Sequence, residues 1–324
     1  MKPRILFVTD FPAAAIFGKE LAPAGYELVI AEAGTDEYTK ALPGADFLVG
    51  FVDKLVKPDL FAAGKNLKLI QLLSAGYDNA DIEAARTARV PICNNGGANS
   101  VAVSEHALLL MLAVSRQLIK QHENVRGGRW RGNSAPTVHE LRNKTLGIIG
   151  LGSIGKKTAR LAQAFGMPVI YNDIQRLSEA EEDALGLRFR LFRELLREAD
   201  LVSLHVPLNE TTRGLIGREE LMEMGKDSIL INTSRGPVVD EAALIEALQS
   251  GIIAAAGLDV FEEEPTPPNN PLLQLDNVTL TAHMAGPTFE SHKARVRNAF
   301  DNVERVQRGE TALWIIDELA ELRG

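Results

Sequence analysis

Short runs of Val, Ile and Leu recur along almost the whole chain, separated by stretches with helical patterning. The runs are apolar without strict alternation, which is typical of parallel strands that are covered on both faces. At roughly 150 residues per domain, a chain of 324 residues holds two such domains. The pattern therefore predicts an α/β protein with two doubly wound parallel sheets.

The expected strands form two series. The first series is Ile5–Val8, Glu27–Ile30, Phe47–Gly50, Leu67–Leu73 and Val90–Cys93. The second series is Thr145–Gly150, Val169–Asp173, Leu201–Val206, Ser228–Thr233, Ala255–Asp259 and Val278–Ala282. A long apolar helix, Ser100–Gln117, separates the two series, and Ser291–Arg308 is expected as the last helix.

Composition excludes several classes of protein. Apolar residues make up 45% and charged residues 24%, which argues against disorder, a collagen-like chain and a coiled coil. Cys93 is the only cysteine, so neither an intrachain disulfide nor a multi-cysteine metal site can form. The longest apolar run, Ala107–Val114, is shorter than the ~18 residues that a membrane helix needs. A net charge of −8 gives no footprint for nucleic acid, so we expect a cytoplasmic protein without nucleic-acid, membrane or metal partners.

The strongest local motif is a glycine-rich turn, Gly150-Leu-Gly152-Ser153-Ile154-Gly155, between the apolar strand Leu146–Ile149 and the helical segment Lys156–Phe165. In such a motif the first glycine permits a tight turn, the second lets a pyrophosphate approach the backbone, and the third lets helix and strand pack closely. The helix N-terminus then offers unpaired N–H groups to the phosphates. The motif predicts a dinucleotide-binding site.

An acidic residue follows at the expected distance. Asp173 ends the next strand, 18 residues after Gly155. A carboxylate at this position accepts hydrogen bonds from both ribose hydroxyls of NAD and repels the 2′-phosphate of NADP. Arg176 lies close by and could accommodate that phosphate, so NAD is the expected cofactor while NADP stays open.

Further segments carry a resemblance to a known family. They are Ser74-Ala75-Gly76, His205-Val206-Pro207, 231–240 (INTSRGPVVD), 257–265 (GLDVFEEEP) and 281–286 (TAHMAG). Together with the glycine motif they closely resemble the D-isomer-specific 2-hydroxyacid dehydrogenase family, in the right order and over nearly the whole chain. The resemblance implies NAD-dependent interconversion of a 2-oxo acid and a D-2-hydroxy acid.

The resemblance also implies residue roles. Arg235 resembles the arginine that binds the substrate carboxylate, His283 the proton donor in reduction, and Glu264 the carboxylate that hydrogen-bonds this histidine. Asp259 resembles the residue that holds the nicotinamide carboxamide. The resemblance places the backbone of Ala75 and Gly76 at the substrate carboxylate. The other residues that it places at the cofactor are His205, Val206, Pro207, Thr212, Thr233 and Gly286.

The chemistry of the reaction needs these residue types. Hydride transfer to a 2-oxo acid builds negative charge on the carbonyl oxygen, which a fixed guanidinium such as that of Arg235 stabilises as it forms. Arginine also matches a planar carboxylate bidentately, as lysine cannot. Histidine titrates near neutrality, so His283 can donate a proton in one direction and accept it in the other. A neighbouring carboxylate, Glu264, favours the imidazolium form.

Departures from the family pattern narrow the substrate. Ala282 stands where the family often has Pro, which removes no functional group. The loop Leu73–Gly76 lacks the Arg of phosphoglycerate-type relatives and the Lys of phosphite-oxidising ones. Glu264 stands where formate dehydrogenases have Gln. The His-x-x-Gly turn resembles the glyoxylate, hydroxypyruvate and glycerate branch, so glyoxylate or hydroxypyruvate is the expected substrate.

Two other functions stay open. One is a phosphoglycerate dehydrogenase-like enzyme, although the chain ends at Gly324 without room for the regulatory domain of some of those relatives. The other is an NAD(H)-sensing corepressor-like protein, because such relatives can retain Arg235, Glu264 and His283. A substrate panel would discriminate between these functions.

The family pattern implies a discontinuous first domain. Residues 1–100 and 288–324 would form a flavodoxin-like substrate domain, and residues 101–287 a Rossmann NAD-binding domain inserted into it. The apolar helix Val101–Val114 is expected between domains or at a dimer interface, since the family is usually dimeric. His106, His122, His139 and His292 are expected to be structural or exposed.

Overall fold

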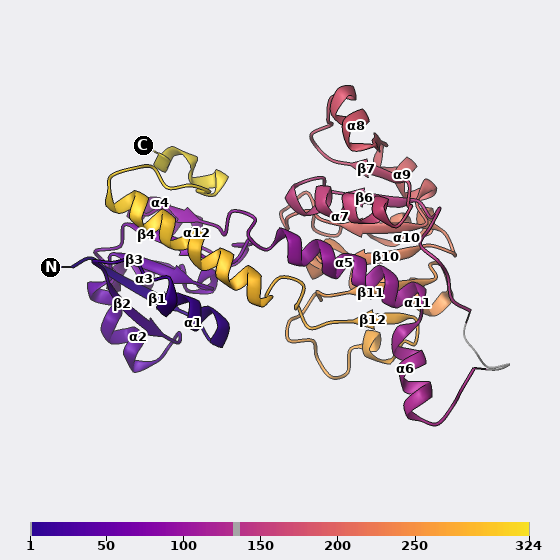
Figure 1. Ribbon diagram of the computed structural model, residues 1–324, viewed down its shortest axis with the longest axis horizontal. Coiled ribbons are helices and arrows are strands. Elements are labelled where there is room, and N and C mark those ends of the chain that lie inside the picture. Colours follow the sequence, from indigo (N-terminus) through magenta and orange to yellow (C-terminus); the bar gives the residue numbers. More distant parts are fainter. Residues whose placement is uncertain (1, 132–136, 324) are drawn as a thin grey trace. The chain divides into compact units, whose positions relative to one another are not determined.

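The computed structural model describes residues 2–131 and 137–323, which divide into two compact units (Figure 1). Unit 1 comprises Met1–Asn99 and Pro287–Gly324, and unit 2 comprises Ser100–Gly286. Each boundary lies one residue before the expected one. Unit 2 is therefore inserted into unit 1, which contains both ends of the chain.

Unit 1 is built on a five-stranded parallel sheet with the order β2-β1-β3-β4-β5, which is the flavodoxin-like order. Its strands are β1 (Arg4–Val8), β2 (Glu27–Ala31), β3 (Phe47–Gly50), β4 (Leu69–Leu72) and β5 (Ile92–Cys93). Its helices are α1 (Pro12–Glu20), α2 (Asp36–Ala41), α3 (Pro58–Ala63), α4 (Ile82–Ala88) and α12 (Phe289–Gln307). Every residue of β3 and β4 is buried, which explains the apolar sequence of β3 and the mainly apolar sequence of β4. The one polar residue of β4, Gln71, is satisfied by a hydrogen bond of 2.8 Å to the Asn94 carbonyl oxygen.

The last long helix completes unit 1. In Figure 1 the yellow helix α12 runs beside the indigo strands of the N-terminal segment, and it packs against α1 and β4. Its buried residues Val296, Ala299, Phe300 and Val303 recur at helical spacing and form one apolar stripe. The Phe300 ring lies 5.9 Å from that of Phe7 in β1. After α12 the chain returns to β5, where Ile315 forms a bridge with Cys93.

Unit 2 is built on a seven-stranded parallel sheet with the order β12-β11-β10-β9-β6-β7-β8. Its strands are β6 (Leu146–Ile149), β7 (Val169–Asn172), β8 (Leu187–Phe189), β9 (Leu201–Leu204), β10 (Ile229–Asn232), β11 (Ala255–Leu258) and β12 (Val278–Leu280). Its helices are α5 (Ser100–Ser115), α6 (Leu118–Arg126), α7 (Ser153–Ala164), α8 (Glu179–Leu185), α9 (Phe192–Glu198), α10 (Arg218–Met224) and α11 (Glu241–Ser250). Six of these strands follow the order of a dinucleotide-binding fold, so the predicted class of two doubly wound sheets is confirmed.

One strand was not predicted. Strand β8 has three residues, Leu187, Arg188 and Phe189, and pairs only with β7 at the edge of the sheet. Leu187 is buried and Arg188 is exposed, as an edge strand allows. Three residues with a charge in the middle give neither an apolar run nor a clear alternation, so the sequence carries too little periodic signal at this point.

The apolar sequence of helix α5 is explained by its burial within unit 2. It packs against α7, β10 and β11, and most of its residues are buried. A Cβ added to Gly257 in β11 would lie 3.0 Å from Cβ of Leu110, so the absence of a side chain there lets helix and strand approach closely. Val101 and Leu109 on the same helix are 53% and 49% exposed, which leaves two apolar side chains outside this core.

Within residues 2–131 and 137–323, no single helix is long and apolar enough to cross a membrane. The pair α5 and α6 has the length and composition only when taken together, and it bends by 60° at the break.

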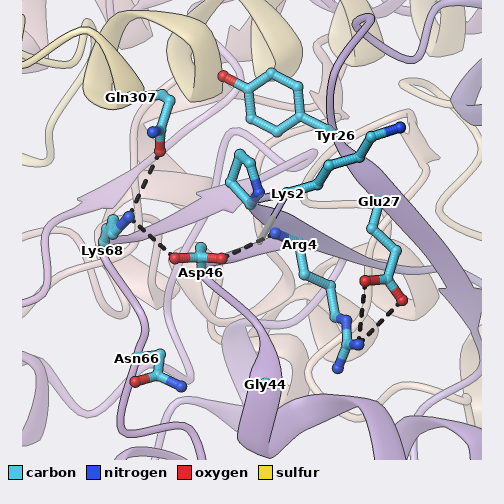
Figure 2. A pocket seen from close by; sticks show the side chains of 10 residues that line it. Lys2, Arg4, Tyr26, Glu27, Gly44, Asp46, Asn66, Lys68 and Gln307 are labelled. Carbon is cyan, nitrogen blue, oxygen red and sulfur yellow. Dashed lines mark hydrogen bonds and ion pairs between the residues drawn. The ribbon is translucent and has the colours of Figure 1, made fainter.

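A pocket of about 850 Å³ lies at the amino ends of the unit 1 strands (Figure 2). Arg4 and Glu27 begin β1 and β2, while Asp46 and Lys68 precede β3 and β4. These charges pair with one another, since Arg4 lies 3.0 Å from Glu27 and Lys68 lies 3.0 Å from Asp46. Ligands of open parallel sheets bind at the carboxyl ends of strands, so this pocket lies on the opposite edge of the sheet.

Candidate active site

The polar residues singled out by the sequence gather at the carboxyl ends of the unit 2 strands. The glycine turn follows β6, Asp173 follows β7, and His205 follows β9. Arg235 lies just after β10, and the segments with Asp259 and His283 follow β11 and β12. In an open parallel sheet these ends form one edge, so the topology brings the residues to the same side of unit 2.

The glycine turn is dictated by packing. Gly150 has φ +92°, and a Cβ on it would lie 2.6 Å from the carbonyl oxygen of His205. A Cβ on Gly155, in the first turn of α7, would overlap the carbonyl oxygen of Gly150. Gly152 instead borders open space, and both it and Ser153 are exposed, whereas Ile154 is half-buried. The turn therefore presents bare backbone at the N-terminus of α7, as a bound pyrophosphate requires.

Asp173 connects the end of β7 to this turn. Its Oδ2 accepts a hydrogen bond of 2.6 Å from the Leu151 amide, and its Oδ1 accepts one of 2.8 Å from the Gln175 amide. The carboxylate is therefore fixed in the βα loop directly beside the glycine turn, the place where a ribose is bound in dinucleotide-binding folds.

Two buried polar atoms at this edge have no hydrogen-bond partner among the described residues. They are Oγ1 of Thr233, after β10, and Nδ1 of His205, after β9. Nε2 of His205 lies 3.0 Å from the Ser203 hydroxyl, and burial lowers the pKa of His205 to about 4, so the ring is neutral at pH 7. Buried polar groups without partners are costly, and a bound ligand with hydrogen-bonding groups would satisfy them. Together with the bare glycine turn, they fit a nicotinamide dinucleotide.

The loop after His205 has its own internal bonds. The Thr212 hydroxyl donates to the carbonyl oxygen of Pro207 at 2.6 Å and accepts from the Asn209 amide at 2.9 Å. Thr212 thereby closes the loop 207–212 into a compact turn. Val206 and Pro207 lie at its start, at the carboxyl end of β9.

Asp259 organises the segment that carries His283. The Asp259 side chain is fully buried, and its Oδ1 accepts from the Thr281 hydroxyl at 2.6 Å and from the Met284 amide at 2.8 Å. Its Oδ2 accepts from the Ala285 amide at 2.9 Å, and its backbone oxygen accepts from the His283 amide at 2.8 Å. One residue therefore fixes the backbone on both sides of His283.

This arrangement supports a strained backbone. His283 has φ +53°, in the left-handed region that residues other than glycine seldom adopt. Such a conformation costs roughly 1–3 kcal/mol and persists only where the surroundings impose it. The four hydrogen bonds to Asp259 do so, and they leave the imidazole of His283 exposed.

His283 and Glu264 form the central pair of the site. Nδ1 of His283 lies 2.7 Å from Oε2 of Glu264, and Oε1 of Glu264 accepts from the Phe261 amide at 3.1 Å. Burial by itself raises the pKa of Glu264. The hydrogen bond and charge of His283, the Phe261 amide and the charge of Arg235 outweigh burial and lower that pKa below its ordinary value. Glu264 is therefore an anion that orients the ring with Nε2 pointing away from it.

Arg235 reaches this pair from the neighbouring strand. Its Nη1 donates to the Ser234 carbonyl oxygen at 2.8 Å, and its own carbonyl oxygen accepts from the Asn232 amide group at 2.9 Å. The next residue, Gly236, has no room for a side chain, because a Cβ there would overlap the backbone at Phe261. The Arg235 turn and the loop 259–264 are therefore in direct contact.

Two residues of this network, His106 and Thr281, were not predicted as site residues. His106, in α5, was expected to be structural or exposed. Its Nε2 lies 2.9 Å from the Thr281 hydroxyl and 3.4 Å from Oδ1 of Asp259. Since Thr281 donates to Asp259, His106 donates to Thr281 and extends the network. A single histidine in an apolar helix carries no sequence signal for such a role.

The remaining predicted residues lie at unit boundaries or in unit 1. Gly286 is buried at the end of unit 2. Ala75 and Gly76 belong to unit 1 and follow the carboxyl end of β4, where the Ser74 hydroxyl donates to the Gly76 carbonyl oxygen at 2.8 Å. This bond turns the loop back on itself.

Comparisons with known proteins assign the chain to a family. Residues 108–285 match the family described as D-isomer specific 2-hydroxyacid dehydrogenase, NAD binding domain. The glyoxylate reductase of Korarchaeum cryptofilum is 35% identical over 323 residues, which cover 96% of this chain and 94% of that protein.

Solved structures give the same result. The crystal structure of a glyoxylate reductase from Paecilomyes thermophila has a TM-score of 0.86 at 32% identity, covering 98% of this chain and 99% of that one. The NADPH-dependent glyoxylate/hydroxypyruvate reductase of Sinorhizobium meliloti, in complex with NADP and malonate, has a TM-score of 0.83 at 28% identity and covers 98% of both chains. The chain belongs to the D-isomer-specific 2-hydroxyacid dehydrogenase family.

Proposed function

We propose that the protein is an NAD(H)-dependent dehydrogenase that interconverts a small 2-oxo acid, glyoxylate or hydroxypyruvate, and the corresponding 2-hydroxy acid of D configuration. The observation that carries the proposal is the 2.7 Å contact of His283 with Glu264, beside the positive charge of Arg235. A proton donor and a cation for the carboxylate are what reduction of a 2-oxo acid needs besides a hydride. The similarity to glyoxylate and hydroxypyruvate reductases supports the substrate class.

The carboxyl edge of unit 2 is assigned to the cofactor. When bound, the nicotinamide cofactor supplies the hydride. The bare backbone of Gly152 and the N-terminus of α7 receive the pyrophosphate, and Asp173 receives the ribose. The Thr233 hydroxyl and the remaining acceptor capacity of Asp259 receive the nicotinamide end, and the loop 207–212 lines the adenine end.

Arg235 is assigned to the substrate. Its guanidinium binds the carboxylate and stabilises the negative charge that develops on the carbonyl oxygen. Glu264, whose pKa is lowered, stays ionised and keeps the local charge balanced.

His283 is assigned to proton transfer. With Nδ1 bonded to Glu264, Nε2 is the ring atom that delivers a proton to the carbonyl oxygen in reduction. The same atom accepts the proton in oxidation. The anionic Glu264 stabilises the imidazolium, and the φ +53° backbone fixes the direction of the ring.

NAD is the proposed cofactor in preference to NADP. Asp173 is negatively charged and accepts from the Leu151 amide beside the glycine turn, where a 2′-phosphate would be repelled. Relatives with this fold include an NADPH-dependent reductase, so the preference is a property of residues near Asp173 rather than of the fold.

Two alternatives have less support. A phosphoglycerate dehydrogenase-like activity would need a cation for the substrate phosphate, and the loop Leu73–Gly76 offers none. A corepressor-like protein that senses NAD(H) would not need the His283–Glu264 pair to be hydrogen-bonded and the imidazole to be exposed.

We also propose a homodimer in the cytoplasm. The exposed apolar side chains on α5 and α6 support the dimer: Val101, Leu109, Leu118, Ile119 and Val125. The single cysteine, Cys93, supports the location, because the chain cannot use an intrachain disulfide.

The proposal is tested by NADH oxidation with a panel of 2-oxo acids. We expect turnover with glyoxylate and hydroxypyruvate, weaker turnover with pyruvate, and little with 3-phosphohydroxypyruvate. Turnover mainly with the phosphorylated acid would favour the phosphoglycerate reading. Tight NADH binding without turnover of any 2-oxo acid would favour the corepressor reading.

A further inference from the structure

Arg176 is the cation nearest in sequence to the ribose-binding acid, three residues after Asp173. Its Nε donates to Oε1 of Glu182, in α8, at 3.1 Å. The guanidinium carbon lies 5.1 Å from the centre of the Phe189 ring, in β8. Arg176 is therefore held by a carboxylate and by the face of an aromatic ring.

Glu182 is held in place by hydrogen bonds from the core of unit 2. The residue is only 5% exposed, and the oxygen that accepts from Arg176 also accepts from the Tyr171 hydroxyl at 3.0 Å. That hydroxyl in turn accepts from the Leu177 amide at 2.8 Å, and Tyr171 is fully buried in the core. The hydrogen bond from Arg176 lowers the pKa of Glu182, so the carboxylate is ionised.

A buried carboxylate of this kind is costly to leave without its countercharge. Moving Arg176 to a new partner would expose that cost. A 2′-phosphate on the ribose would have to compete with Glu182 for the guanidinium, in addition to meeting the negative charge of Asp173. The sequence thus places a cation close to Asp173, but in the structure that cation is bound to Glu182 and Phe189.

We propose that Glu182 is a specificity-determining positioning residue, which withholds Arg176 from the ribose 2′-phosphate and so keeps the protein selective for NAD(H). This inference rests on the proposed assignment of Asp173 to the ribose. It divides selectivity between two carboxylates: Asp173 repels the phosphate, and Glu182 removes the cation that could bind it. The arrangement also gives β8 a function, since the Phe189 ring packs against the guanidinium of Arg176.

Glu182→Gln tests the inference, because the amide keeps an acceptor for Tyr171 but loses the charge that holds Arg176. The substitution is made in the full chain with Asp173→Ala, so that repulsion does not mask the gain. Dissociation constants for NADH and NADPH are measured by calorimetry. Adding E182Q to D173A should tighten NADPH binding about tenfold and leave NADH binding within twofold.

Matched variants identify the cause. Asp183 follows Glu182 in α8 and pairs with Arg188 at 3.0 Å. The control Asp183→Asn breaks this other ion pair and should not change NADPH binding. Adding Arg176→Ala to the D173A/E182Q protein should abolish the gain, while R176A added to D173A alone should change little. If R176A weakens NADPH binding in the D173A protein with Glu182 intact, Arg176 is not withheld and the inference is wrong.

A failure of the inference differs from a failure of the proposed function. A protein that binds NADH but gains no NADPH affinity from E182Q contradicts the role of Glu182. A wild-type protein that binds neither NADH nor NADPH contradicts the proposed function itself. Should E182Q not fold, judged by its melting curve, Phe189→Leu removes the aromatic contact with Arg176 and gives the same comparison.

Discussion

Nδ1 of His283 lies 2.7 Å from Oε2 of Glu264, although the two residues come from segments that follow different strands of the unit 2 sheet. The contact depends on Asp259, which holds the backbone on both sides of His283. His283 is therefore positioned by the buried carboxylate of Asp259 and hydrogen-bonded to the more exposed carboxylate of Glu264.

Glu264→Gln keeps an acceptor for the Phe261 amide and removes the charge beside His283. Because the imidazolium loses its counterion, we expect kcat for reduction to fall by about 10–100-fold. The measurement is kcat for reduction of glyoxylate by NADH, compared with wild type. A kcat equal to that of wild type would show that the Glu264 charge does not assist proton transfer.

Arg235→Lys keeps the charge but loses the planar, two-pronged donor. We expect kcat/KM for the 2-oxo acid to fall by about 10²–10³-fold, with NADH affinity unchanged. The matched control is Arg218→Lys, since Arg218 pairs with Glu246 on the surface of unit 2 and should tolerate the change. Equal effects of the two substitutions would argue against Arg235 as the substrate ligand.

Gly236→Ala tests the contact between the Arg235 turn and the loop that carries Glu264. A Cβ at position 236 would overlap the Phe261 backbone, whereas one at Gly217 would meet its nearest atom at 3.4 Å. We expect G236A to lower both the melting temperature and kcat/KM, and G217A to leave both near wild type. A fully active G236A protein would mean that the two loops are not rigidly coupled.

His292 gives a prediction about stability and pH. It is buried near Phe11 and Phe51, and burial, together with the charge of Arg295, lowers its pKa to about 4. The unfolded chain binds the proton near pH 6.5, so the contribution of His292 to stability is complete above pH 6.5 and is lost as the pH falls toward 4. The full effect is about 3 kcal/mol, from 1.4 kcal/mol per pKa unit.

The corresponding measurement is urea unfolding of wild type and His292→Leu at pH 7.5 and pH 4.5. The wild-type midpoint should fall more than that of the variant over this interval. Equal losses for the two proteins would place the acid sensitivity elsewhere, for example at His205, whose pKa burial also lowers to about 4.

The sequence predicted the parts of the fold that have strong periodic or glycine signals. The runs that became β3 and β6 are apolar and buried throughout, so composition alone revealed them. The glycine turn is constrained by the chain itself, because Gly150 and Gly155 leave no room for a Cβ. Such steric requirements are visible in residue identity.

Long-range polar contacts were not visible in the same way. His106 and Thr281 are 175 residues apart, and Arg176 gives no sign in the sequence that Glu182 and Phe189 will hold it. Strand β8 is three residues long and half exposed, so its pattern is too weak to recognise. These features arise from tertiary packing, which leaves no hydrophobic periodicity or short motif in the local sequence.

The most direct test of the account is His283→Ala, with steady-state reduction of glyoxylate by NADH and calorimetric NADH binding measured on the same protein. The account predicts a loss of about 10²–10⁴-fold in kcat, as for removal of a general acid, with the NADH dissociation constant within twofold of wild type. Turnover close to that of wild type would contradict the assignment of His283 as proton donor.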